Sequence, residues 1–190
     1  MPKAYIDEHI SDFDLQQALA EVSPQRRAHA LRYRNERDQR QCLAAYRLLQ
    51  HALSQEFGIS DELPQFEYDP SGKPRLLGHP DIHFSLSHCR EAVACVVDSR
   101  AVGIDIETLD HYSHEVAARV MSEKEMRQIL TSPYPAEAFT RLWTMKESLY
   151  KLTGDDGGGD IAHMLTDSLP VTFETTVHPS YVCTVCRFRL

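Results

Sequence analysis

Apolar and non-apolar side chains alternate through residues 102–107, which read Val-Gly-Ile-Asp-Ile-Glu. This period is that of a β-strand with one apolar face and one acidic face. At a rise of ~3.3 Å per residue, Asp105 and Glu107 emerge on the same side, about 6.6 Å apart. Two carboxylates at that separation can converge on one hard cation. Gly103 shares their face, and we expect it to leave open space beside them.

A second pattern predicts a helix over residues 136–153. Its apolar positions share one side of a helical wheel, and these are Leu142, Met145, Leu149 and Leu152. That side should face the core. Glu147 and Lys151 lie one turn apart on a different face, so we expect Glu147 to complete the acidic cluster and Lys151 to reach a phosphate oxygen. Alone, an Asp-x-Glu strand or an i,i+4 ion pair is usually just solvated surface.

Two further segments carry groups suited to binding phosphate. Residues 84–88 read Phe-Ser-Leu-Ser-His and alternate like a strand, ending in Ser87 and His88, which can both donate hydrogen bonds to phosphate oxygens. Residues 69–74 read Asp-Pro-Ser-Gly-Lys-Pro, a turn from which Lys73 projects. Either segment alone has a plain structural explanation. Their combination with the acidic strand points to metal-assisted phosphate chemistry.

Residues 26–47 are strongly basic in an acidic protein. They hold seven arginines against Glu36 and Asp38, a local net charge of +5, whereas the whole chain carries −8. Nucleic acid is not an expected partner, because aromatic side chains are not interleaved for base stacking and no groove-reading motif is present. A solvated helical face, a phosphate site and a surface for an acidic carrier protein all stay open as explanations.

In their order and spacing, the motifs resemble the 4'-phosphopantetheinyl transferases of the two-domain type typified by the surfactin-synthetase activator. The matching segments run along most of the chain. They are residues 22–27, 38–40, 72–74, 84–88, 102–107 and 143–148, together with Lys151. The resemblance implies an α+β fold of two similar halves related by a pseudo-twofold axis, with the ligand cleft between them.

The resemblance also implies a reaction. The phosphopantetheine part of coenzyme A is transferred to a serine of an apo acyl or peptidyl carrier protein, and adenosine 3',5'-bisphosphate is released. The expected metal is Mg²⁺, with Mn²⁺ as the alternative. Because a serine hydroxyl has to attack a phosphorus of a charged pyrophosphate, we expect charge neutralisation and in-line positioning to account for most of the catalysis.

Family roles transfer to individual positions of this sequence. Asp105, Glu107 and Glu147 match the metal ligands. Glu147 is also the candidate to accept the serine proton, and Lys151 matches the lysine that neutralises or protonates the leaving phosphate. The positions expected to hold the adenosine and its 3'-phosphate are Arg26, Gly72, Lys73, Pro74, Ser87 and His88. Glu125 aligns with another acidic position near the metal, although a solvated helix carboxylate is an equally open interpretation.

Two features depart from the family pattern. His29 stands where the family often has a second basic residue, so the grip on the 3'-phosphate is expected to be weaker or pH-dependent. After Lys151 the family usually continues through a basic loop, whereas residues 154–160 here read Gly-Asp-Asp-Gly-Gly-Gly-Asp. No Lys-Ser or Lys-Thr pair follows, so this run is interpreted as a flexible linker rather than a phosphate cradle.

The chain is expected to be a cytoplasmic monomer. It has no apolar run of about 20 residues and no charged-then-apolar leader. Five cysteines, an odd number, suit a reducing compartment. Cys183 and Cys186 have the spacing of half a zinc site, but they fall in an expected strand and no second pair follows. One chain carrying both halves has no need to oligomerise.

The spacing of apolar residues and the positions of turn-forming residues predict the helices and strands, and Ser99–Arg100 is the expected boundary between the two halves. Residues 1–100 are expected to form the half that contacts the adenosine and 3'-phosphate, and residues 101–190 the half with the metal and catalytic residues. The predicted helices are 23–33, 38–57, 114–120, 122–130 and 136–153. The predicted strands are 3–7, 66–68, 83–87, 92–98, 101–107, 171–176 and 181–187.

Two other classes of protein share parts of the pattern. A metal-dependent nuclease or phosphohydrolase also combines such acids with a lysine, but it has no use for the Gly-Lys-Pro turn or the Ser-Leu-Ser-His segment. A non-catalytic module that binds coenzyme A or a carrier protein would be expected to lack a metal acid or the lysine. All of these residues are present in the sequence.

Overall fold

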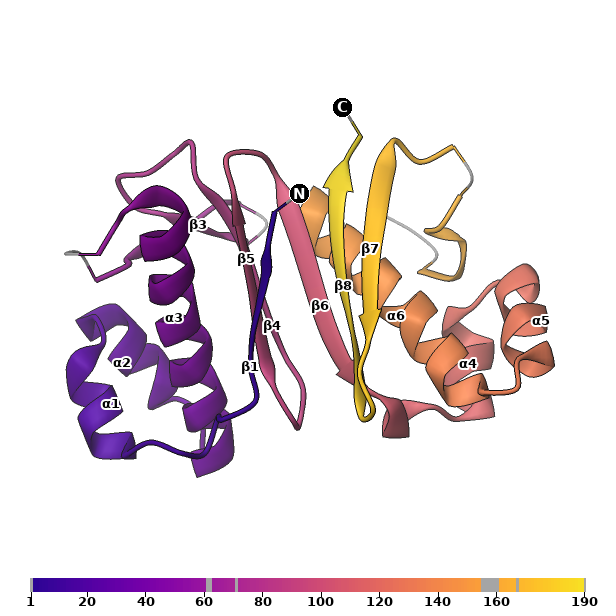
Figure 1. The fold of residues 1–190 in the computed structure, drawn as a ribbon, viewed down its shortest axis with the longest axis horizontal. Helices are drawn as coiled ribbons and strands as arrows, with labels where there is room; N and C mark the ends of the chain where they lie inside the picture. The colour runs from indigo at the N-terminus through magenta and orange to yellow at the C-terminus, as the bar shows by residue number, and fades with distance from the viewer. Residues whose placement is uncertain (1, 61–62, 71, 155–160, 167, 190) are drawn as a thin grey trace.

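The computed structural model describes residues 2–60, 63–70, 72–154, 161–166 and 168–189. It consists of two α/β halves whose sheets lie side by side at the centre, with helices on the outer faces (Figure 1). The Asp/Gly run 155–160, for which we predicted a flexible linker, lies outside the described residues.

The N-terminal half is built on a three-stranded antiparallel sheet. Its order is β1 (Ala4–Asp7), β5 (Val93–Asp98) and β4 (His83–His88). The long helix α3 (Glu36–Phe57) packs on this sheet and ends at Gly58, whose φ of 68° is left-handed backbone that favours glycine. The remaining elements of this half are α1 (Leu15–Glu21), α2 (Pro24–Ala30) and the antiparallel pair β2 (Phe66–Tyr68) and β3 (Pro74–Leu76).

The C-terminal half repeats this plan. Its antiparallel sheet has the order β6 (Val102–Thr108), β8 (Tyr181–Phe188) and β7 (Val171–Val177). The long helix α6 (Pro135–Thr153) packs on β6 and β8. The remaining elements are the 3₁₀ turn η1 (Leu109–His111), α4 (His114–Val120), α5 (Glu123–Thr131) and the 3₁₀ turn η2 (Ile161–His163).

The two sheets have the same topology. In each half the first strand pairs with the last, the last pairs with the one before it, and the long helix lies between the first two strands in the chain. This equivalence, which no repeat in the sequence reveals, confirms the expected α+β fold of two similar halves.

The two halves meet along the facing edges of β4 and β6 and share a hydrophobic core. Ala94 and Val96 of β5 belong to the same buried cluster as Ile104 and Ile106 of β6. At the edge, the buried hydroxyls of Ser85 and Ser87 accept hydrogen bonds from the backbone N–H groups of Ile104 and Ile106. The junction is therefore held by apolar packing and by side-chain hydroxyls.

Most predicted elements are confirmed to within a few residues at their ends. The sequence interpretation missed α1 and β3, which are only seven and three residues long. Cys183 and Cys186 are buried in β8 with free thiols. Within the described part of the chain, no helix combines the length and the apolarity needed to cross a membrane.

Candidate active site

Gly103 sets how closely α6 approaches β6. A Cβ atom at this position would lie 2.0 Å from the carbonyl oxygen of Ser148 and 2.7 Å from the amide nitrogen of Leu152, both in the backbone of α6. The expectation that Gly103 leaves open space is therefore wrong, because the helix backbone fills that space. The close approach brings the side chains of α6 within reach of the acidic face of β6.

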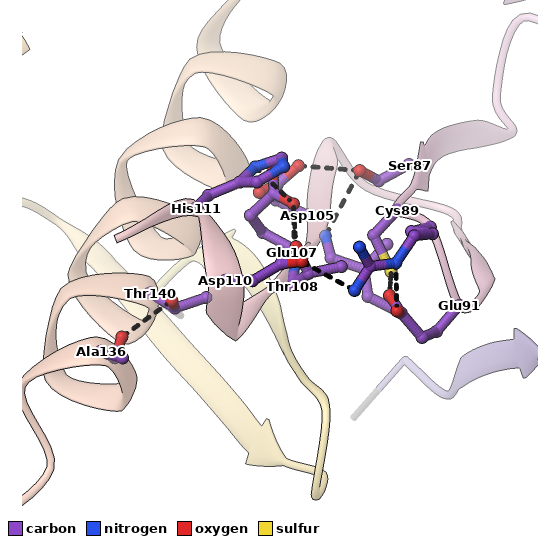
Figure 2. Close-up of polar contacts among 12 residues, drawn as sticks. Ser87, Cys89, Glu91, Asp105, Glu107, Thr108, Asp110, His111, Ala136 and Thr140 are labelled. Carbon is purple, nitrogen blue, oxygen red and sulfur yellow. Dashed lines mark hydrogen bonds and ion pairs between the residues drawn. The ribbon is translucent and has the colours of Figure 1, made fainter. Parts of the chain in front are cut away.

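Lys151, Asp105 and Ser87 form a compact polar cluster at the junction. The Lys151 ammonium donates to Asp105 Oδ1 at 2.7 Å and to Ser87 Oγ at 2.9 Å. The Ser87 hydroxyl donates to the same Asp105 oxygen at 2.7 Å, as Figure 2 shows. Asp105 is only 6% exposed, so its charge is compensated inside the protein. One residue from β4, one from β6 and one from α6 thus meet at a point between the halves.

Glu107 lies two residues after Asp105 in β6, and its partners are the two nearby residues Thr108 and His111. Its Oε1 accepts from the backbone N–H of Thr108 at 2.7 Å and lies 3.1 Å from Nδ1 of His111 (Figure 2). His111 belongs to η1, four residues after Glu107, and the sequence interpretation did not single it out. The signal available for it was weak, since an isolated histidine after a strand is usually structural.

Glu147 lies on α6, half-buried beside these acids. Burial raises its pKa, and the negative charge of Asp105 raises it further, with a smaller contribution from Glu107. Lys151 acts in the opposite direction. These electrostatic couplings indicate that Glu147 lies near both Asp105 and Glu107, with Lys151 as the positive charge that partly offsets them.

The three carboxylates suit Mg²⁺ in their chemistry, because this ion prefers oxygen ligands and a few carboxylates. Their present arrangement is not that of a closed metal site. Within the described ranges, no three His, Cys, Asp or Glu side chains are placed to hold a metal ion. Lys151 engages Asp105, while Thr108 and His111 engage Glu107. These contacts involve only Oδ1 of Asp105 and Oε1 of Glu107, so a cation could bind the second oxygen of each carboxylate or replace these partners.

A cavity of 280 Å³ lies on one side of Lys151 and draws its lining from both halves. The turn before β3 contributes Gly72, Lys73 and Pro74. The turn expected to bind the coenzyme and the lysine expected to act in catalysis thus line one space. The Lys73 ammonium, however, donates to the backbone carbonyls of Lys151 at 2.5 Å and Leu152 at 3.1 Å. Burial, followed by the charge of Arg75, lowers the pKa of Lys73.

A second cavity, of 430 Å³, is lined by α2, α3 and the end of β4, including Ser87. Arg26 and His29 of α2 face Ser87 and His88 across it. The Nε of Arg26 is buried without a hydrogen-bond partner, and its guanidinium lies over the rings of Tyr46 and Phe66, 5.5 and 5.9 Å from their centres. A buried guanidinium nitrogen without a partner would be stabilised by an anion bound next to Arg26.

Both histidines of this cavity are disfavoured as cations in the free protein. Burial, followed by the charge of Arg26, lowers the pKa of His29. His88 keeps an exposed edge, but the surrounding protein removes enough water to lower its pKa, and the charge of Lys151 adds to the shift. The second cavity therefore joins a permanent cation, Arg26, to two histidines that an anion would help to protonate, and the carboxylate of Asp38 also lines it.

Glu125 is not a solvated carboxylate, because it is buried and paired with Lys146. Its side chain is 6% exposed and accepts from the ammonium of Lys146 at 2.8 Å and from the backbone N–H of Ser122 at 2.7 Å. Lys146 is fully buried and also donates to the carbonyls of Val120, Ile161 and Ala162. The interpretation of Glu125 as a solvated carboxylate was wrong, because the sequence did not reveal that Lys146, next to Glu147, turns inward to meet it.

These features define a protein of two equivalent α/β halves with a carboxylate and lysine centre where they meet, an arrangement suited to the transfer of a phosphate-bearing group. Comparisons with known proteins place it more narrowly. Residues 101–186 match the family model of the 4'-phosphopantetheinyl transferase superfamily. The chain is 30% identical over 152 residues to the 4'-phosphopantetheinyl transferase Sfp of Bacillus subtilis (strain 168). The chain belongs to the 4'-phosphopantetheinyl transferase superfamily.

Other relatives agree. The chain is 34% identical over 151 residues to the 4'-phosphopantetheinyl transferase psf-1 of Bacillus pumilus, and 31% identical over 149 residues to the 4'-phosphopantetheinyl transferase HetI of Nostoc sp. (strain PCC 7120). The alignments with Sfp, psf-1 and HetI include 79%, 78% and 74% of this chain. They span 68%, 65% and 63% of those relatives. The family resemblance inferred from the motifs is confirmed.

Proposed function

We propose that this protein transfers 4'-phosphopantetheine from coenzyme A to a serine of an apo acyl or peptidyl carrier protein, and that the junction between its halves is the active site. Phosphopantetheinyl transfer to carrier proteins is the activity of the family to which the chain belongs. The observation that carries the assignment to the junction is the cluster of Ser87, Asp105 and Lys151, in which Lys151 lines one cavity and Ser87 lines the other.

In this proposal the carrier serine attacks the phosphorus next to the pantetheine part of coenzyme A. A new oxygen–phosphorus bond forms, and the pyrophosphate bond to adenosine 3',5'-bisphosphate breaks. Glu147 accepts the serine proton, a role supported by burial and neighbouring carboxylates that make it more basic than an ordinary glutamate. Lys151 neutralises the charge that develops on the leaving phosphate, since its ammonium already lies between the halves.

We assign Asp105, Glu107 and Glu147 as the residues that would hold Mg²⁺, or Mn²⁺ in its place. The bound cation would supply charge neutralisation for the pyrophosphate. In the free protein Lys151 donates to Asp105 and the His111 ring contacts Glu107, so these two side chains keep the carboxylates in place. A cation that took the place of Lys151 on Asp105 would leave the Lys151 ammonium available to the leaving phosphate.

Coenzyme A is proposed to lie across the division between residues 1–100 and 101–190, in contact with both cavities. Gly72, Lys73 and Pro74 line the smaller cavity together with Lys151, which supports a role for this turn beside the adenosine. Arg26, Ser87 and His88 line the larger one, which supports a 3'-phosphate site there. The unpartnered Nε of Arg26 favours an anion at that position.

The working compartment and the oligomeric state belong to the same proposal. All five cysteines are free and buried in the structure, which supports a reducing compartment such as the cytoplasm. The site draws its residues from both halves of one chain, so a monomer suffices for activity.

The experiment is an intact-mass assay on a panel of apo carrier proteins, with coenzyme A and Mg²⁺ and with an EDTA control. We expect a metal-dependent gain of one phosphopantetheine on at least one carrier. Glu147→Gln is expected to abolish the gain, while thermal unfolding and coenzyme A binding stay close to those of the unaltered protein. Near-normal turnover of this variant would remove Glu147 from the mechanism.

The assay also separates the two rival functions. Coenzyme A binding without mass gain on any carrier would favour a non-catalytic binding module. Release of adenosine 3',5'-bisphosphate from coenzyme A in the absence of a carrier would favour a metal-dependent phosphohydrolase. Either result would contradict the proposed transfer.

A further inference from the structure

The edge between the two sheets has no backbone ladder of its own. β4 is the terminal strand of the sheet β1-β5-β4, and β6 is the terminal strand of the sheet β6-β8-β7. Every strand edge presents backbone N–H groups that need partners once they are buried. At this junction, serine hydroxyls of β4 supply acceptors for the N–H groups of β6.

The two serines hold β4 and β6 in a fixed register. Ser85 Oγ accepts from the N–H of Ile104 at 3.1 Å, and Ser87 Oγ accepts from the N–H of Ile106 at 3.3 Å. Both pairs advance by two residues in the same direction, so the strands run parallel with one constant offset. This offset decides where Ser87 of the N-terminal half meets Asp105 of the C-terminal half.

Ser85 differs from Ser87 in the bonds of its hydroxyl. Ser87 contacts Asp105 and Lys151 directly and is part of the proposed active site. The hydroxyl of Ser85, two residues before Ser87, accepts from the N–H of Ile104, two residues before Ile106. Ser85 is 6% exposed and Ile104 is 0% exposed. Loss of this hydroxyl would leave the N–H of Ile104 buried without its acceptor, so the strands would be expected to shift or separate locally.

We propose that Ser85 is a positioning residue for phosphopantetheine transfer. Its hydroxyl holds the offset of β4 against β6, and through that offset it places Ser87 against Asp105 and Lys151. The inference rests on the proposed function, because it concerns how that active site is aligned. A displacement of about 1 Å between reacting groups can cost roughly a hundredfold in rate, so a small shift of this edge has a measurable effect.

The test compares Ser85→Ala with the unaltered protein at a temperature where circular dichroism shows both to be fully folded. We expect kcat for transfer to fall by about tenfold or more, with a smaller change in the Kd for coenzyme A. Hydrogen exchange provides a direct readout of the bond, since the Ile104 amide should exchange faster in the variant. Ser85→Thr retains the hydroxyl and is expected to recover most of the lost kcat.

Thr140→Val is the matched control. Thr140 is fully buried on α6, and its hydroxyl donates to the carbonyl of Ala136 within the same helix, at 2.9 Å (Figure 2). Its removal deletes a buried hydroxyl without taking an acceptor from a backbone N–H across the junction. We expect this variant to change Tm but to keep its kcat.

The outcomes are separable. An unchanged kcat in folded Ser85→Ala would overturn the inference, as would a loss of coenzyme A affinity with kcat retained, which would make Ser85 a binding residue. If Ser85→Ala fails to fold, the near-isosteric Ser85→Cys takes its place, since sulfur is a poor acceptor. Full kcat in that variant would also overturn the inference. A lack of transfer by the unaltered protein would instead contradict the proposed function, whereas amide exchange at Ile104 would still report on the junction.

Discussion

The ammonium of Lys73 donates a hydrogen bond to the main-chain carbonyl of Lys151, 2.5 Å away and on the other half of the molecule. A second bond, to the carbonyl of Leu152, places this cation at the C-terminus of α6. Unpaired carbonyls and the negative end of the helix dipole favour a cation there. The turn expected to face coenzyme A is thereby tied to the backbone of the proposed catalytic lysine.

Lys73→Met should reveal this connection. The variant removes the cation from the end of α6 but keeps a long apolar stem, so we expect a lower kcat together with a higher KM for coenzyme A. Because the ammonium points to the helix, the KM of dephospho-coenzyme A should rise by a similar factor. The assay is steady-state transfer with both substrates. If the KM rose for coenzyme A but not for dephospho-coenzyme A, the Lys73 ammonium would instead be assigned to the 3'-phosphate.

Gly103→Ala should disrupt the active site by forcing α6 away from β6. Its new methyl group would meet the backbone of α6 at Ser148 and Leu152, at distances that no side-chain rotation can relieve. We expect a loss of about 1–3 kcal/mol in the free energy of unfolding, as in overpacked cores, together with a large fall in kcat. Urea unfolding and the intact-mass assay measure the two effects. An active variant of unchanged stability would show that α6 can move away from β6 without cost.

The elements nearest the site were predictable because their patterns are local. Alternation from Val102 predicted a strand at 101–107, and the structure has it at Val102–Thr108. Helical spacing of leucines predicted a helix over 136–153, and α6 spans Pro135–Thr153. In both segments most of the apolar positions are buried, so the local signal identified the element. The burial of polar side chains such as Asp105 and Lys146 in the same elements was not part of that signal.

The contacts between the halves could not be predicted in this way. Lys73 and Lys151 are 78 residues apart, and no local pattern indicates that one caps the helix that carries the other. The space beside Gly103 was misjudged for the same reason, since its occupant is the backbone of α6 rather than a neighbour in sequence. The family resemblance gave the types and the order of the site residues. The hydrogen-bond partners of these residues in the free protein depend on tertiary structure and could only be seen there.

The buried pair of Lys146 and Glu125 should be a structural unit. Lys146→Met would leave the Glu125 carboxylate without its counter-charge, at an expected cost of about 3–5 kcal/mol in the free energy of unfolding. The double variant Lys146→Met with Glu125→Leu should recover part of that loss, because no buried charge then stands alone. Chemical denaturation of the two singles and the double gives the coupling. If Glu125→Gln abolished transfer without lowering stability, Glu125 would have to act in the chemistry.

His29 should make the use of coenzyme A depend on pH. Burial and the charges of Arg26 and Arg32 lower its pKa from the ordinary value of 6.5, so the free protein holds it mostly neutral at pH 7. A phosphate in the cavity that it shares with Arg26 favours the protonated form. The contribution of His29 to binding is therefore present at low pH and is lost as the pH rises through its pKa. Its 3'-phosphate grip should be weakest in alkaline buffer.

The measurement is the KM for coenzyme A from about pH 5.5 to about pH 8.5, which brackets the ordinary range of histidine. Because the 3'-phosphate itself titrates near pH ~6, His29→Gln serves as the reference that shares this effect. The unaltered protein should have the lower KM at the acid end, and its advantage over His29→Gln should vanish at the alkaline end. His29→Lys should lower the KM at the alkaline end by roughly tenfold, since a lysine stays charged there. Parallel pH profiles for all three proteins would place the 3'-phosphate away from His29.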